Sequence, residues 1–150
     1  MEGCLACDLA EGRIDLPGGE ILNEGGWIVE HTVGPLGVGT LIVKPRRHIV
    51  HVSELDDDEA TDLGPLLRRV AVLLERLTGA DQVYVTLWSH HGGRPVHIHF
   101  VVQPVTRALM DDIGALGPHL QTAMFDRGVD PDRDEVERFA DRARAELALH

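Results

Sequence analysis

The chain has 150 residues and a mass of 16.5 kDa, the size of one domain with its own core. Apolar residues make up 43% and charged residues 26%, a globular balance that excludes wholesale disorder. Lys plus Arg is 14 against 25 for Asp plus Glu, a net charge of −11, which excludes a uniformly basic nucleic-acid-binding surface. We therefore expect no nucleic-acid polymer as a partner. No apolar run approaches ~20 residues, so we also expect no membrane partner.

The first segment carries the only two cysteines, Cys4 and Cys7, in a C-x-x-C spacing. This segment has neither a basic start nor a long apolar stretch, so we expect no signal peptide and a reducing, cytoplasmic location. A disulfide closing so small a loop would constrain little. The pair is therefore predicted to be metal-binding, redox-active or incidental.

The first half of the chain predicts three strands and one long helix. Residues 20–31 form two short strands around Gly25-Gly26, and the apolar run 39–45 is a third that stops at Pro45. Asp56 followed by Glu59 is a capping-box pattern. Pro65 is expected to kink the helix, and Gly79 is expected to end it. The apolar residues that recur at helical spacing before Gly79 are Leu63, Leu66, Leu67, Val70, Leu73, Leu74 and Leu77.

The second half predicts a hairpin followed by helices. Residues 82–89 and 96–103 are strands joined by a long polar turn, HHGGRP, over 90–95. Helices are expected over 106–126 and 131–149. Because strands and helices do not alternate, the fold class is α+β with an antiparallel sheet. We expect one domain over 1–150, with a helical C-terminal extension from residue 105.

Two imidazoles lie two residues apart in the strand His97-Ile98-His99-Phe100-Val101-Val102-Gln103. Alternation sends the odd-numbered residues to one face and the apolar Ile98, Phe100 and Val102 to the other, which packs on the core. Paired imidazoles suit metal ligation or nucleophilic attack on phosphorus. Two surface histidines are the plain alternative on this spacing alone.

Three blocks in order are similar to the histidine-triad superfamily, which includes the branch of galactose-1-phosphate uridylyltransferase. They are the C-x-x-C segment, the segment GTLIVKPRRH that ends at His48, and the segment GGRPVHIH that ends at His99. The second block departs from the family pattern at Thr40, where His is usual. The resemblance covers residues 4–104 and implies a histidine-triad-like fold.

The resemblance implies a structural zinc site formed by Cys4, Cys7, His48 and His97. Four thiolate and imidazole ligands form a closed tetrahedral shell, which is typical of structural zinc. The alternatives are a reduced cysteine pair beside unrelated histidines, or a redox pair, for which the usual thioredoxin-like context is missing. His51, three residues after His48, is the rival ligand.

The resemblance also implies that His99 is the nucleophile, which attacks the α-phosphorus of a nucleotide and forms a covalent nucleotidyl-histidine. The backbone of Gly92-Gly93 and the side chain of Arg94 are candidate donors to the phosphoryl oxygens. His90 and His91 either line the same loop or face solvent. For Arg94 the alternative is an ordinary exposed cation.

The family binds the base and ribose on the stretch that corresponds to His31-Thr32-Val33. Thr32 stands where an acidic residue usually binds the ribose hydroxyls. Trp27 and Val33 either flank the base or belong to the core, and for Trp27 we favour the core.

The third triad position carries Val101, which can neither donate a proton nor hydrogen-bond a phosphate. His90, His91 or Gln103 are the candidates to compensate. We expect a nucleotide hydrolase or nucleotidyltransferase acting on mononucleotide conjugates or dinucleoside polyphosphates. The alternatives are a nucleotide-binding module with weak or no catalysis, and a zinc-stapled interaction protein. Relatives in the family commonly form homodimers, so we expect one here.

Overall fold

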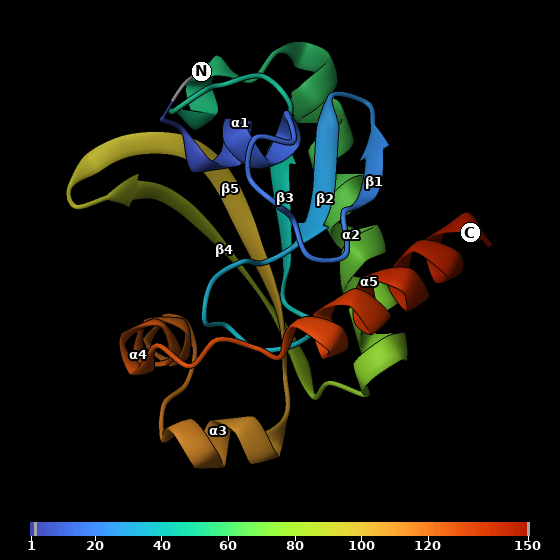
Figure 1. Ribbon diagram of the computed structural model, residues 1–150, viewed down its shortest axis with the longest axis vertical. Helices are drawn as coiled ribbons and strands as arrows, with labels where there is room; N and C mark the ends of the chain where they lie inside the picture. Colours follow the sequence, from blue (N-terminus) through green and yellow to red (C-terminus); the bar gives the residue numbers. More distant parts are fainter. Residues whose placement is uncertain (2, 150) are drawn as a thin grey trace.

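The computed structural model describes residues 1 and 3–149 and contains one five-stranded antiparallel sheet (Figure 1). The order of the strands across the sheet is β1-β2-β3-β5-β4. Their bounds are β1 (Glu20–Glu24), β2 (Trp27–His31), β3 (Leu41–Pro45), β4 (Gln82–His91) and β5 (Arg94–Val105). Together with the helices, this sheet confirms the predicted α+β class.

Helices cover both faces of the sheet. They are α1 (Leu5–Ala10), α2 (Asp57–Thr78), α3 (Arg107–Ile113), α4 (Pro118–Arg127) and α5 (Arg133–Ala148), with a short 3-10 turn η1 (Val52–Glu54). On one face the main core joins the strands to α2, which Figure 1 shows behind the sheet, and to α5. On the other face a smaller core packs under α3 and α4, and α1 crosses the sheet near β2 and β3. This second face carries His97 and His99, and we call it the His99 face.

The long helix α2 begins where the capping box places it. Asp56 accepts a hydrogen bond from the Glu59 backbone N–H, and the Glu59 carboxylate accepts one from the Asp56 N–H. The helix ends at Gly79, whose φ of 64° is left-handed. It continues through Pro65 to Thr78 as one element, so the expected kink does not divide it.

The prediction of a long polar turn between β4 and β5 is wrong. The two strands run to His91 and from Arg94, and these two residues pair with each other. Only Gly92 and Gly93 form the turn, with φ values of 57° and 75°. Positive φ at both central residues is the requirement of a tight type I′ hairpin, which glycine satisfies without strain.

The single helix expected over 106–126 is two helices. Gly114, with φ of 73°, ends α3 in a left-handed conformation, and Pro118 occupies the first turn of α4. The expected last helix is confirmed as α5, capped by the Asp132 side chain. Among the described residues, none of the helices combines the length and apolarity needed to cross a membrane.

The six-residue helix α1 was not predicted, because it is too short for a periodic pattern to reveal. Cys4 is its N-cap and Cys7 lies inside it, so the C-x-x-C pair occupies its first turn. A helix of this length is not stable alone in water. Contacts with the rest of the molecule must hold it in place.

Candidate metal centre and histidine strand

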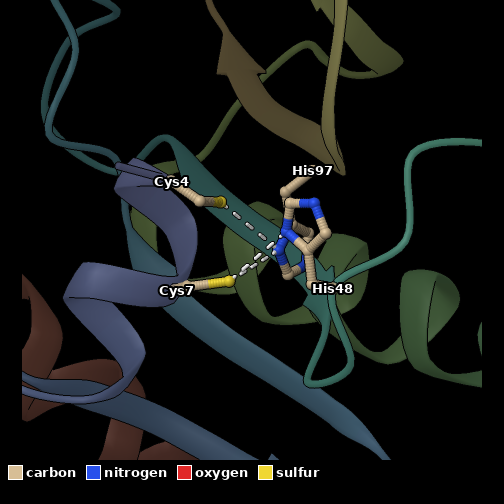
Figure 2. Close-up of side chains that lie close together, drawn as sticks. All are labelled: Cys4, Cys7, His48 and His97. Carbon is tan, nitrogen blue, oxygen red and sulfur yellow. Dashed lines mark hydrogen bonds between the residues drawn. The ribbon is translucent and has the colours of Figure 1, made fainter. Parts of the chain in front are cut away.

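Four side chains that are far apart in the sequence converge beside α1. Cys4, Cys7, His48 and His97 each offer one ligand atom, and these four atoms lie within 4.8 Å of one another. Figure 2 shows the two thiols and two imidazoles pointing toward one another. The Cys7 Sγ lies 3.4 Å from the His48 Nδ1 and 3.6 Å from the His97 Nδ1, and the Cys4 Sγ lies 3.8 Å from the His97 Nδ1.

These separations match the edges of a small tetrahedron. Bonds of about 2.0–2.3 Å to nitrogen and sulfur put neighbouring tetrahedral ligands roughly 3.4–3.8 Å apart. The structure therefore brings together the four ligands that the sequence resemblance implied, and the three thiol–imidazole separations fit a tetrahedral metal. The rival ligand His51 is exposed, begins the η1 turn and is outside this cluster.

The protonation of the cluster also suits a metal. The Nε2–H of His97 donates to the Pro45 carbonyl at 2.7 Å, which leaves Nδ1 as the lone-pair nitrogen facing the thiols. Burial lowers the pKa of His97 to about 4, so its ring is neutral at pH 7. Burial also raises the pKa of the Cys7 thiol, and a bound cation would offset this by stabilising the thiolate.

The ring of His99 is half-buried on the His99 face, and its orientation is fixed by the backbone. Its Nδ1 lies 3.0 Å from the His97 carbonyl oxygen, so Nδ1–H is the donor and Nε2 carries the free lone pair. Burial lowers the pKa of His99, and the positive charge of Lys44 acts in the same direction. His97 therefore faces the metal site with its side chain and orients His99 with its backbone.

Farther along β5 the same face is closed to solvent. Val101 is 1% exposed and packs with Leu36, Leu120 and Met124 in the smaller core. The amide of Gln103 is fully buried, and its Nε2 donates to the Leu36 carbonyl at 3.2 Å. The structure thus places Gln103 in the core beneath α4, where it has no access to a ligand in solution.

The stretch predicted to hold the base and ribose divides between core and surface. His31 is buried against Phe139, its Nδ1 donates to the Thr32 carbonyl, and its Nε2 accepts from the Gly39 N–H. Both ring nitrogens are thereby engaged. Trp27 is also a core residue, as favoured from the sequence, and it donates to the Glu59 carbonyl.

Thr32 and Val33 line a cavity of about 340 Å³ between α1, the following loop and the start of α5. Its walls are mostly apolar, with Leu5 and Leu9 on one side and Val136 on another. A cavity of this size is at the lower end of the range for small-ligand sites. A second cavity of about 350 Å³, beside α2, is lined by Trp27 but by none of the other candidate site residues.

The residues predicted to bind phosphate lie at the tip of the β4–β5 hairpin. His90, His91, Gly92, Gly93 and Arg94 are all exposed there, and Figure 1 shows the tip extending away from the sheet. An extended strand rises about 3.3 Å per residue, so Arg94 lies roughly 16 Å along β5 from His99. The structure therefore does not bring these hairpin residues close to the His99 ring.

Sequence reasoning missed one charged pair on the His99 face, Glu30 and Lys44. The Lys44 Nζ donates to the Glu30 Oε1 at 2.7 Å, and the two side chains are 3% and 1% exposed. The signal was present, since opposite charges interrupt the apolar segments WIVEH and LIVKP at positions that face the same way. Only the pairing of β2 with β3 shows that they meet.

No protein-family model matches the chain, and no curated protein does either. Solved structures do. A zinc-bound histidine-triad family protein from Mycobacterium smegmatis has a TM-score of 0.70 at 20% identity, covering 98% of this chain and 96% of that one. The chain has the histidine-triad fold. A Hit-like protein from Bartonella henselae, described as involved in cell-cycle regulation, has a TM-score of 0.72 at 15% identity and coverages of 97% and 96%.

A histidine-triad nucleotide-binding protein from Sulfolobus tokodaii, with a TM-score of 0.70 at 15% identity, covers 97% of this chain and 93% of its own. At such identities the likeness establishes the histidine-triad fold and nothing finer. It nevertheless extends over almost the whole chain, including the helices beyond residue 105, where the motifs of the sequence end.

Proposed function

We propose that the protein is a nucleotide hydrolase or nucleotidyltransferase that works through a covalent nucleotidyl-His99 intermediate. The observation that carries this proposal is the hydrogen bond from the His99 Nδ1 to the His97 carbonyl. It fixes the tautomer whose Nε2 lone pair is free to attack. The histidine-triad fold and the half-buried position of the ring support the same conclusion.

The reaction proceeds in two displacements. The His99 Nε2 lone pair forms a P–N bond to the α-phosphorus, and the bond to the leaving group breaks with its electron pair on the leaving oxygen or nitrogen. Water or an acceptor phosphate oxygen then attacks the phosphorus and breaks the P–N bond, whose electron pair returns to the His99 Nε2; when water attacks, its proton is released to solvent. Mononucleotide conjugates and dinucleoside polyphosphates contain such a phosphorus, and we propose them as the substrate class.

We further propose that Cys4, Cys7, His48 and His97 hold a structural zinc ion. The donor set and the separations between its atoms support this metal, and the M. smegmatis protein of the same fold is zinc-bound. Four protein ligands leave no open position, so the ion would link α1 to β5 and to the segment after β3. Thiolate ligands also fit the reducing, cytoplasmic location that we propose.

The decisive experiment is to trap the intermediate. Wild-type protein is incubated with a panel of labelled mononucleotide conjugates and dinucleoside polyphosphates, quenched at low temperature, and analysed by mass spectrometry for label on His99. We expect adduct in the wild type and none in His99→Gln, with His119→Gln on the exposed surface as the matched control. Absence of any His99-dependent adduct across the panel would overturn the enzymatic proposal.

A binding module without catalysis is the second candidate, and the burial of Val101 favours it. No imidazole stands at this third position, and the residues around it are apolar. Calorimetric binding of a nucleotide by a chain that forms no adduct and shows no turnover would select this function.

A further inference from the structure

Glu30 and Lys44 form a buried ion pair on the face of the sheet that carries His99. Glu30 pairs with Ile42 between β2 and β3, and Ile42 pairs with Val101 between β3 and β5. Alternate residues of a strand share a face, so Glu30, Lys44 and His99 all project to one side. The sheet order β2-β3-β5 then puts Lys44 between Glu30 and the histidine strand.

Lys44 lies next to His99. The register that pairs Val43 with Phe100, continued by one residue along each strand, makes Lys44 of β3 and His99 of β5 neighbours across the two strands. The Lys44 Nζ also donates to the Ala6 carbonyl of α1 at 2.9 Å, so the ammonium is held from two sides.

The pair is expensive to bury and is not fully satisfied. The Glu30 Oε2 has no hydrogen-bond partner among the described residues, and Lys44 uses two of its three donors. An apolar pair at such a place is often as stable as an ion pair or more so. Stability alone therefore does not explain why charged residues occupy these two positions.

We propose that Lys44 is a positioning residue for the reaction at His99. Its ammonium is 1% exposed and is held by Glu30 and the Ala6 carbonyl, so it does not touch the phosphoryl group but stabilises the anionic group through its electric field while the P–N bond forms. No proton passes through Lys44. Val101 offers the phosphoryl group neither charge nor a hydrogen bond, so charge on this face has to come from another residue. The proposal rests on the proposed nucleotidyl-His99 chemistry.

The test separates the charge from the fold by changing both partners. Lys44→Met alone leaves a buried carboxylate uncompensated, and we expect a lower Tm. Two double variants remove the charges together: Glu30→Leu with Lys44→Met is apolar, and Glu30→Gln with Lys44→Gln keeps hydrogen bonding. We expect at least one of them to recover the wild-type Tm and metal content. Arg127→Met removes an exposed cation paired with Asp112 and is the control for the loss of one positive charge in Lys44→Met; the double variants leave the net charge unchanged.

The readout is the single-turnover rate of adduct formation at saturating nucleotide. In the recovered double variant we expect this rate to fall at least tenfold, while Arg127→Met keeps the wild-type rate. Calorimetry adds a measurement that does not depend on the folded fraction. The Kd of a nucleoside monophosphate should rise about tenfold, and that of the uncharged nucleoside should not change.

Two outcomes distinguish this proposal from the one on which it rests. Wild-type adduct formation together with an unchanged rate and an unchanged monophosphate Kd in the charge-free variants overturns the role of Lys44 alone. Absence of adduct in the wild type overturns the proposed chemistry itself. In that case a selective loss of monophosphate affinity still assigns Lys44 to phosphate binding.

Discussion

At the scale of single residues, the packing around Val101, at the third triad position, determines what another side chain could do there. Val101 packs under Leu120 and Met124 of α4, with the loop residue Leu36 beside them. An imidazole at this position would be buried among apolar side chains with no hydrogen-bond partner. We therefore do not expect a histidine introduced at position 101 to restore a catalytic role.

We predict that Val101→His lowers the free energy of unfolding by about 1–3 kcal/mol, the cost of an unsatisfied buried polar group. The rate of adduct formation at His99 should not rise. Urea denaturation and the trapping assay measure the two quantities on the same preparation. Wild-type stability combined with a faster reaction would show that α4 yields to the larger side chain.

A second prediction at this scale concerns pH. Burial lowers the pKa of His31 below its ordinary value of 6.5, so the unfolded state binds the proton first as the pH falls. The contribution of this residue is complete above about pH 6.5 and is lost as the pH falls toward the folded pKa; His97 and His99 act in the same direction. His31→Gln should make the loss shallower by up to about 1.4 kcal/mol per pH unit.

Denaturant midpoints measured between pH 7.5 and pH 5 provide the check, with metal content held constant. His119→Gln, at an exposed position, is the matched control and should keep the wild-type slope. If His31→Gln also keeps that slope, the ring is not held neutral by the fold.

At the scale of elements, α1 depends on its tertiary contacts. Its own six residues cannot sustain a helix, so the cluster and the bond from Lys44 to the Ala6 carbonyl must hold it. We predict that a chelator lowers the Tm by on the order of 10 °C and speeds amide hydrogen exchange over residues 5–10. Metal analysis should give one ion per chain in His51→Ala and none in His48→Ala. Slow exchange in the metal-free chain would mean that packing alone holds α1.

At the scale of the whole molecule, the open edge of the sheet bears on assembly. β4 is an edge strand, and its residues Val85 and Leu87 are 45% and 38% exposed. Exposed apolar edges favour association with another chain. We propose a homodimer that uses this edge, and we predict that Leu87→Lys shifts sedimentation from dimer to monomer. A wild-type chain that sediments as a monomer at all concentrations would contradict this proposal.

Sequence patterns predicted the elements that have local causes. The capping box predicted the start of α2, hairpin signals, apolar runs and alternation predicted the strands, and glycines and prolines marked where elements end. The two incorrect predictions of element bounds also have local causes, because both concern glycines. Gly92-Gly93 is a two-residue turn, and Gly114 divides a predicted helix into two.

The sequence by itself predicted the α+β class, and its resemblance to the histidine-triad superfamily pointed to the four residues that converge beside α1. It could do so because hydrophobic period and motif order are properties of the chain. Only the tertiary structure decided which polar residues are buried and which charges meet. Gln103 and His31 belong to the core, the hairpin tip lies away from His99, and Lys44 lies beside it. Burial and pairing depend on contacts between distant segments, such as that between Gln103 and Leu36, 67 positions apart, and no local pattern encodes them.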